Sequence, residues 1–418
     1  MSTKQIWIFV GLLVALGVGY VSYFFWQNLR GIKPAITPAN QDIAEIIEDQ
    51  TKQELIGGPN QVPFPLTLPD NFRISVFAEN FEKPRVLKKD PAGVLLVSDS
   101  EAGQIIALPD SNQDLVADAH QVVIDNLDQP HGIEFLHFDD GYKMYIATIN
   151  AITSYDYDEG HQNATNPVKI VDLPKDGLHT TRTLSKTNIN GEQKLLVSIG
   201  SSCNICNETD SRHAAIMILN PDGSQFETYA TGLRNSVFLT TRDGTNEIWA
   251  TENGRDLLGD DLPPDEINII EGGSNYGWPL CYGQNIHDTN FSHDPTDPCS
   301  TGATVASHID LQAHSAPLGL DFFPAGGVWP DDLVGDLLVA YHGSWNRSEP
   351  TGYKIVRFNL DKLGQEKSRT DFITGWLQPD NNSLGRPVDI LIEPNGNIYI
   401  SDDKQGVGLI YLLQYTNI

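Results

Sequence analysis

Positive charge is scarce in this chain. Its 418 residues include 27 Lys and Arg against 55 Asp and Glu, so the formal net charge is −28 at pH 7. A protein that binds nucleic acid needs a basic face to neutralise phosphates. The composition therefore excludes nucleic acid as the expected partner, although it does not indicate a fold.

Cysteine is scarce as well, and the spacing of the four cysteines indicates whether they bind zinc or form disulfides. Cys203 and Cys206 form a Cys-x-x-Cys pair, whereas Cys281 and Cys299 lie 18 positions apart, so the spacing usual for a four-cysteine zinc site is missing. Two local disulfides, Cys203–Cys206 and Cys281–Cys299, fit better, and four free buried thiols are the alternative. Disulfides indicate an oxidising compartment, so we expect the body of the protein in the periplasm or at the cell surface.

Charged residues are missing altogether from residues 6–26. This run of 21 residues is long enough for a transmembrane anchor, whereas a cleavable signal sequence usually has a shorter apolar region and a small-residue cleavage site. No such site precedes the end of the run, so an uncleaved membrane anchor is predicted. Residues 1–5 then form a short cytoplasmic N-terminus, and residues 27–61 a linker to a folded body at 62–418.

Helical periodicity is nearly absent after residue 60, and short β-rich runs recur instead. The runs start about 50 residues apart, with one step of about 90, and Asp-Gly or Asn-Gly turns lie between strands. Six units of about four strands predict an all-β, six-bladed β-propeller. A two-sheet sandwich array is the alternative, but it would lack the larger period. The runs are Val94–Val97, Met144–Ala147, Leu195–Ser198, Glu247–Ala250, Leu337–Ala340 and Asn397–Ile400.

An acidic, turn-rich stretch, Thr251–Pro279, begins the step of about 90 residues, and we expect this extra length after the fourth blade. Long loops inside compact domains are uncommon unless they bind something, and oxygen-rich loops suit calcium. A solvated loop of ordinary turn formers is the alternative. The candidate calcium ligands are Asp260, Asp261, Asp265 and Glu266.

Arginines at the ends of the predicted strands are informative in so acidic a protein. Because loops at strand ends converge on one face of a propeller, these arginines could clamp a carboxylate there, with structural ion pairs as the alternative. His131 and Trp345 lie in similar motifs and could contact substrate, although structural roles are the alternative for both. The arginines are Arg182, Arg234, Arg347 and Arg386.

Together these motifs resemble the soluble glucose/sorbosone dehydrogenase family, quinoprotein sugar dehydrogenases that use pyrroloquinoline quinone (PQQ). The resemblance covers roughly residues 62–415 and is nearer to the sorbosone dehydrogenase branch. It implies a six-bladed propeller with PQQ and calcium as cofactors. The matching stretches are HTTRTL at 179–184, LLVSIGSSCNIC at 195–206, GLRN at 232–235, PPDEINIIEGGSNYGWP at 263–279, SAPLGLDFF at 315–323, HGSWNR at 342–347 and GRPVDILIEPNGNIYISDD at 385–403.

The resemblance also implies roles for single residues. His179 matches the general base, which takes a proton from the C1 hydroxyl of an aldose or from an aldehyde hydrate while hydride passes to the quinone. Arg234 matches a residue that stabilises negative charge on the quinone. Gly254 and Arg255 match positions whose main-chain carbonyls bind the cofactor calcium. The further cofactor-binding candidates are Arg182, Asn235, Asn346, Arg347 and Arg386.

Two departures from the family pattern leave three hypotheses. Val388 stands where the glucose dehydrogenase branch has a second cofactor arginine, and Ser236-Val237 stand where it has a glutamine. The first hypothesis is a PQQ- and calcium-dependent sugar or aldehyde dehydrogenase that passes electrons to a membrane quinone or cytochrome. The second is a cofactor-free binding propeller outside the cytoplasm. The third, a calcium-dependent hydrolase of the lactonase type, ranks last because that class binds its metal through side chains.

Overall fold

The computed structural model describes residues 3–28, 60–293, 298–404 and 408–416. Helix α1 spans Thr3–Asn28, and the elements described after residue 60 are strands, apart from the short 3-10 helix η1 at Pro298–Ser300. Most of the predicted linker, 27–61, lies outside the described residues.

The membrane anchor predicted at residues 6–26 is not supported. A membrane-spanning helix needs about 20 consecutive, predominantly apolar residues. Among the residues that the structure describes, no helix is both long and apolar enough to cross a membrane.

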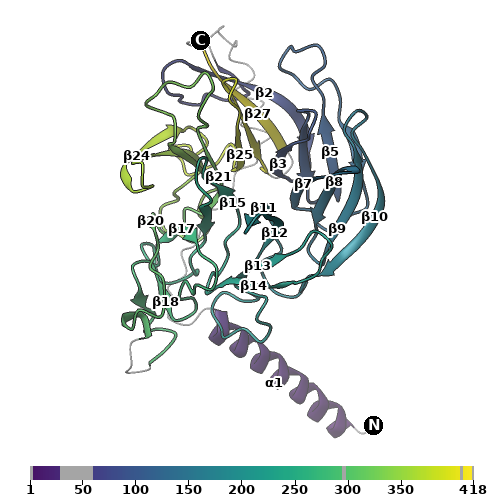
Figure 1. Cartoon of the computed structure of the whole chain (residues 1–418). Coiled ribbons are helices and arrows are strands. Elements are labelled where there is room, and N and C mark those ends of the chain that lie inside the picture. Colours follow the sequence, from purple (N-terminus) through teal and green to yellow (C-terminus); the bar gives the residue numbers. More distant parts are fainter. Residues whose placement is uncertain (1–2, 29–59, 294–297, 405–407, 417–418) are drawn as a thin grey trace.

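Six of the sheets are arranged as blades around a common centre and are antiparallel apart from the β1–β2 pair, which confirms the predicted six-bladed propeller (Figure 1). The first strand of each blade contacts the first strand of the next, from β3 through β7, β11, β15, β21 and β25 back to β3.

The first two blades are β3 (Pro84–Lys89), β4 (Leu95–Asp99), β5 (Gln104–Leu108) and β6 (Gln121–Ile124), then β7 (Gly132–Phe138), β8 (Gly141–Ala147), β9 (Ala151–Asp158) and β10 (Asn163–Asp172). The third blade is β11 (Leu184–Ile189), β12 (Glu192–Ile199), β13 (Ala215–Leu219) and β14 (Glu227–Thr231). The fourth and fifth are β15 (Leu239–Thr241), β16 (Ile248–Glu252), β17 (Asp265–Ile270) and β20 (Ile309–Leu311), then β21 (Pro317–Phe322), β22 (Leu337–Tyr341), β23 (Lys354–Leu360) and β24 (Glu366–Ile373).

The sixth blade closes the ring with strands from both ends of the body. It contains β25 (Pro387–Ile392), β26 (Asn397–Asp402) and β27 (Gly408–Tyr415), and its outer strands are β2 (Phe72–Phe81) and β1 (Asn60–Gln61). Strand β2 pairs antiparallel with β27, with Phe72 opposite Tyr415. The closure therefore joins residues that are far apart in sequence, and the repeat pattern did not predict it.

Each of the six predicted runs is the second strand of a blade. Strands β4, β16 and β22 are buried along their whole length, and the apolar halves of β8, β12 and β26 are buried too. A strand covered on both faces is continuously apolar rather than alternating. That burial explains why these strands gave the clearest signal in the sequence.

The extra length associated with the fourth blade lies inside that blade, not after it. Residues 271–308 connect β17 to β20 and contain the hairpin of β18 (Cys281–Tyr282) and β19 (Ile286–His287). Cys281–Cys299 closes this insertion, and Cys203–Cys206 closes a loop of the third blade. Both predicted disulfides are confirmed.

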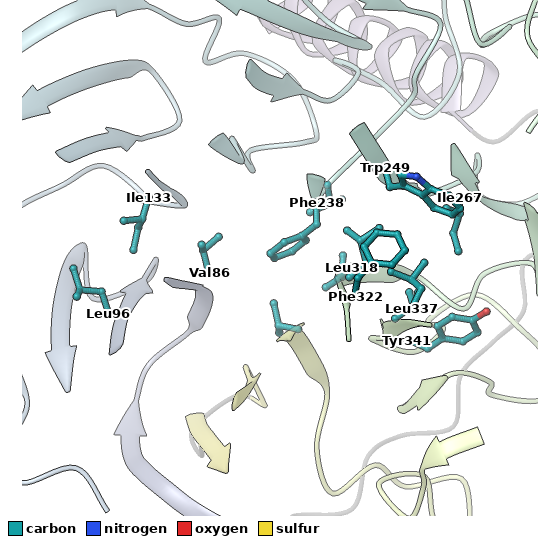
Figure 2. Packing of buried hydrophobic residues seen from close by; sticks show 14 of the residues in the cluster. Val86, Leu96, Ile133, Phe238, Trp249, Ile267, Leu318, Phe322, Leu337 and Tyr341 are labelled. Atoms are coloured by element: carbon teal, nitrogen blue, oxygen red, sulfur yellow. The ribbon is translucent and has the colours of Figure 1, made fainter. Parts of the chain in front are cut away.

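The largest core cluster packs strands of neighbouring blades against one another (Figure 2). Phe238, Trp249 and Leu318 belong to this cluster, and so does Val388, which is fully buried. The position that lacks the second arginine is therefore a core position here, and its side chain cannot contact a ligand.

The predicted site motifs lie in two kinds of loop that open on the same end of the propeller. One kind precedes the first strand of a blade, and the other joins its second strand to its third. Because neighbouring strands run antiparallel, both kinds emerge at one face. The fold thus gathers these motifs on a single surface, here called the loop face.

Candidate functional site

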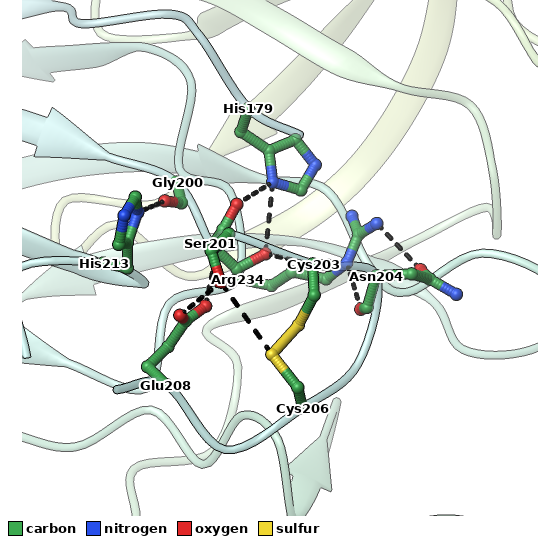
Figure 3. Close-up of a disulfide and its surroundings, with 10 residues drawn as sticks. His179, Gly200, Ser201, Cys203, Asn204, Cys206, Glu208, His213 and Arg234 are labelled. Atoms are coloured by element: carbon green, nitrogen blue, oxygen red, sulfur yellow. Dashed lines mark hydrogen bonds between the residues drawn. A yellow bond between two sulfur atoms is a disulfide. The ribbon is translucent and has the colours of Figure 1, made fainter. Parts of the chain in front are cut away.

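His179 lies in the loop before β11 and is held by the first residue of another loop. Its ring Nδ1 is 2.8 Å from the carbonyl oxygen of Ser201 and 3.1 Å from the Ser201 hydroxyl (Figure 3). A carbonyl only accepts hydrogen bonds, so Nδ1 carries the proton and Nε2 has a free lone pair. Burial, followed by the charge of Arg234, lowers the pKa of His179 to about 3. The imidazole is therefore a neutral base with Nε2 as its basic atom.

Arg234 is buried at the centre of a hydrogen-bond network. Its guanidinium donates to the main-chain carbonyls of Asn253 and Gly254 at 3.1 and 2.8 Å and pairs with the Asp256 carboxylate at 2.9 Å. It also donates to both the carbonyl and the side-chain oxygen of Asn204 at 2.9 Å. These contacts hold the positively charged Arg234 guanidinium in one place, next to His179.

Asn235 packs against the base through a glycine. A Cβ atom built on Gly200 would lie 2.5 Å from the Asn235 side-chain oxygen and 2.6 Å from the His179 Cβ. Only glycine permits this approach. The structure thus brings together three residues predicted for one site: His179, Arg234 and Asn235.

The two residues predicted to bind cofactor calcium through carbonyls differ in their surroundings. The Gly254 carbonyl already accepts a hydrogen bond from Arg234, and a carbonyl oxygen has a second lone pair for a cation. The Arg255 side chain pairs with Asp288 at 2.7 Å, and both side chains are almost completely buried. The side chain of Arg255 is therefore structural, and a ligand role for this residue is confined to its main chain.

Arg182, a predicted cofactor-binding residue, is turned toward the backbone of its own loop. Its side chain is completely buried and donates to the carbonyls of Pro174, His179 and Thr181 at 2.7–2.9 Å. It fastens the loop that carries His179. The motif predicted an arginine near the site but could not distinguish a clamp for a ligand from a clamp for the backbone.

Asn346 and Arg347 lie on the loop after β22, but only Asn346 contacts the Arg234 network. Asn346 donates to the Asp256 carboxylate at 3.1 Å, and its side-chain oxygen is buried without a hydrogen-bond partner among the described residues. Arg347 instead contacts the carbonyl of Asp260 and pairs with Asp261 at 3.4 Å. Arg347 therefore joins two loops, with its charge partly neutralised.

The four carboxylates predicted for a second calcium do not converge. Asp260 accepts from the Ser348 amide and Asp265 from the amides of Gly254 and Ala316, whereas Glu266 accepts from that of Gly283. Adjacent strand residues such as Asp265 and Glu266 point to opposite faces. Among the described residues they do not form a cluster with metal-binding geometry. The structure therefore does not bring these four carboxylates together, and it gives no support to a joint site.

Glu266 instead faces Glu252 across the β16–β17 ladder. Both carboxyls line a narrow pocket with Arg234, Arg255 and Asp288. Burial, reinforced by the other glutamate, raises the pKa of Glu252 to about 8, and burial raises the pKa of Glu266 to about 7. At neutral pH the pocket thus holds one carboxyl that is largely protonated, Glu252, and one that is about half protonated, Glu266.

A second cationic sector surrounds Arg386 on the loop face. Arg386 donates to the Gly343 carbonyl at 2.9 Å, and its guanidinium lies 5.7 Å from the ring centre of Tyr353. His342 lies 3.5 Å from Asp403, and Asp403 also pairs with Arg85 at 2.5 Å. Burial and the charge of Arg386 lower the pKa of His342 to about 3.

Sequence reasoning missed Arg85 and Asp403. Arg85 lies in the Lys-Pro-Arg segment that opens β3, and Asp403 directly follows β26, so both occupy strand ends like the motifs that were selected. The criterion that selected the other motifs, a polar residue at the end of a predicted strand, could have found them. Their importance comes from the closure of the ring, which brings the first blade against the sixth.

His131 and Trp345, the substrate candidates, have opposite environments. His131 is buried, and its Nδ1 lies 3.1 Å from the Thr183 hydroxyl, which itself donates to the Val237 carbonyl. Nδ1 therefore carries the proton, and Nε2 has no partner among the described residues. Trp345 is 54% exposed on the loop face, so its ring is open for stacking.

The fold and the site define this chain as a six-bladed β-propeller with a histidine beside an arginine on the loop face. The TrAA12-like family model matches residues 66–416, and the chain belongs to that family. An uncharacterized protein of Borreliella burgdorferi is 32% identical over 352 residues, which cover 81% of this chain and 88% of that protein. The sorbosone dehydrogenase branch is not confirmed.

Named relatives include proteins whose cofactor is stated. The pyrroloquinoline quinone-dependent pyranose dehydrogenase of Coprinopsis cinerea is 25% identical over 84% of this chain, which spans only 55% of that longer protein. A structure of a Trichoderma reesei family AA12 carbohydrate-active enzyme matches with a TM-score of 0.71, 25% identity and coverage of 85% and 99% of the two chains. The holo PQQ domain of the Coprinopsis pyranose dehydrogenase matches with a TM-score of 0.69 and 24% identity, over 85% and 98%.

Proposed function

We propose that this protein is a PQQ- and calcium-dependent oxidoreductase that oxidises the C1 hydroxyl of an aldose or an aldehyde hydrate. The observation that carries the proposal is the neutral His179, whose basic Nε2 is free, beside the fixed charge of Arg234. The names of the relatives support it, since they include a PQQ-dependent pyranose dehydrogenase.

The residues present suit a ligand with several carboxylates and a bound cation. PQQ is a quinone with three carboxylates, and the loop face offers Arg386 and Arg85, with His342 as a hydrogen-bonding neighbour. The unpartnered Asn346 oxygen is a further polar contact for the ligand. The main-chain carbonyls of Gly254 and Arg255 are the oxygen ligands proposed for calcium.

The chemistry divides between the cofactor and the chain. PQQ, when bound, supplies the hydride acceptor. His179 Nε2 accepts the proton of the substrate hydroxyl, while its Nδ1–H stays on the Ser201 carbonyl and keeps the ring oriented. Arg234 stabilises negative charge that develops next to the base. Arg182 holds the His179 loop and takes no part in the reaction.

The finer parts of the proposal concern substrate, acceptor and location. We propose a sorbosone-like sugar or aldehyde as substrate, with Trp345 as its stacking surface and His131 as an acceptor of a substrate hydrogen bond. A quinone or cytochrome is the proposed electron acceptor. The two disulfides support a location outside the cytoplasm.

A cofactor-free binding propeller is the second candidate. It is favoured by the burial of Val388, because one cation of the glucose dehydrogenase pattern is missing from the loop face. The lactonase-type hydrolase loses support because the acidic residues of the 260–266 loop do not share a site.

The deciding experiment titrates the full chain, prepared without PQQ, with PQQ in the presence and absence of calcium. Cofactor absorbance reports binding, and a panel of aldoses and aldehydes is then added. Saturable, calcium-dependent binding followed by bleaching of the quinone is the expected result. Absence of binding under every condition would favour the cofactor-free propeller.

A further inference from the structure

The loop of residues 201–208, here called the CNIC loop, contacts the segment that carries His179. The Ser201 carbonyl accepts from His179 Nδ1, and the Ser202 carbonyl accepts from the amide of Leu178 at 3.0 Å. Gly177 has a φ of 116°, and a Cβ there would lie 2.5 Å from the Ser202 Cα. The CNIC loop therefore sets both the position and the tautomer of the base.

The same loop also contacts Arg234. The Asn204 carbonyl and side-chain oxygen accept from the guanidinium, and the side-chain oxygen also accepts from the Asp256 amide at 2.8 Å. The Asn204 amide group donates back to the Asp256 carbonyl at 3.1 Å. Asn204 is buried, so water cannot readily replace these bonds.

The Cys203–Cys206 disulfide closes the loop at the point where the two sets of contacts meet (Figure 3). The Ser201 hydroxyl, which also lies by His179, donates to the Cys203 carbonyl at 2.6 Å. Both cysteines are only partly buried, so a thiol can reach the bond. The crosslink thus joins the support of the base to the support of the cation.

We propose that the Cys203–Cys206 disulfide is a redox-sensitive brace that positions His179 and Arg234 together, with Asn204 as a positioning residue. This inference rests on the proposed function. A dithiol reductant breaks the S–S bond: its own two thiols become a disulfide, and two electrons and two protons end on the sulfurs of Cys203 and Cys206. The freed loop then holds the base and the cation less precisely, and turnover falls.

The first test compares two double variants of the full chain. In C203S/C206S we expect kcat to fall about 100-fold with KM unchanged, because misplacement of a reacting group by about 1 Å has an effect of that size. C281S/C299S is the matched control and keeps its kcat. Dithiothreitol should slow C281S/C299S and leave C203S/C206S unchanged, provided that it is removed under anaerobic conditions before PQQ is added.

Asn204 supplies the second variant pair. Asn204→Ala should lower kcat as the disulfide variant does, whereas Asn204→Asp keeps an oxygen that accepts from Arg234 and from the Asp256 amide and should recover most of the activity. Unchanged kcat in both C203S/C206S and Asn204→Ala would overturn the proposal.

Hydrogen exchange separates this inference from the proposed function. The amides of Leu178, Ser201 and Asp256 should exchange about ten-fold faster in C203S/C206S, while those of β12 keep their protection. This readout needs neither PQQ nor substrate, so a failed dehydrogenase assay leaves it intact. Unchanged exchange at all three amides would refute the brace, whatever the activity.

Discussion

The two disulfide loops of this propeller contain the same bond and differ in what they touch. The CNIC loop bonds to His179, Arg234 and Asp256, which lie in other loops. In the insertion of the fourth blade, the Cys281 amide donates to the Gly277 carbonyl, a local partner, and Asp288 pairs with the structural side chain of Arg255. A crosslink thus supports chemistry only where its loop reaches functional side chains, and the comparison predicts different results for changes in the two regions.

The largest effect is expected at the base beside the CNIC loop. His179→Ala should lower kcat by about 10²–10⁴-fold, because it removes the group proposed to accept the substrate proton. PQQ binding, followed by absorbance, should survive. His137→Ala, on the exposed part of β7, is the matched control. Full turnover in His179→Ala would remove the reason for a brace at this loop.

A buried ion pair near the second disulfide should matter for stability instead. Asp288 pairs with Arg255 and accepts from the amides of Asn290 and Phe291 in the insertion. Asp288→Asn leaves the buried Arg255 charge without its counter-ion, so the free energy of unfolding should fall by roughly 3 kcal/mol. Urea titration measures this change, and steady-state assays below the transition should show an unaltered kcat. A large loss of kcat in the folded variant would contradict the division between the regions.

Removal of the Cys281–Cys299 disulfide should lower the free energy of unfolding by a similar or slightly smaller amount than Asp288→Asn. In the chain-entropy model, a loop of about 18 residues contributes roughly 3 kcal/mol, whereas the shorter Cys203–Cys206 loop contributes about 2. C281S/C299S should therefore unfold at a lower urea concentration than C203S/C206S while remaining the more active variant. The reverse order, either of the urea concentrations of unfolding or of the activities, would contradict the proposed difference between the two disulfide loops.

The smallest effect is a difference in pH dependence between the regions. The pKa of Glu266 is raised by burial to about 7, so the folded state binds its proton more tightly, and the stabilisation present below about pH 4.5 is lost as the pH rises to 7. The pKa of His179 is lowered to about 3, so its contribution is present above 6.5 and lost as the pH falls.

Glu266→Gln tests the direction of this pH dependence. The variant should be tolerated because Asn268, whose side-chain oxygen is unpartnered among the described residues, can turn to accept a hydrogen bond from the new amide. Relative to the unaltered protein, the variant should gain about 2.5 kcal/mol of stability between pH 5 and pH 8, measured by urea unfolding at both pH values. If the variant and the unaltered protein differ in stability by the same amount at pH 5 and at pH 8, Glu266 does not titrate in this window.

The second strands of the blades were predictable because burial on both faces makes them continuous apolar runs, as in β4 and β22. His179 and Arg234 were selected through the family resemblance of the motifs at strand ends in which they lie. Arg182 shows the limit of that reasoning. Its position near the site followed from its motif, but the direction of its side chain depends on the carbonyls that the folded loop presents.

The sequence by itself determined the repeat, the two disulfide pairs and the motifs that reach the loop face, because each depends on local pattern or short spacing. Only the tertiary structure decided which charges meet. Ring closure brings Arg85 and Asp403 together across 318 positions, and strand alternation separates Asp265 from Glu266 although they are neighbours in sequence. Contacts between blades depend on how the sheets pack, and packing is a property of the whole ring that no single segment encodes.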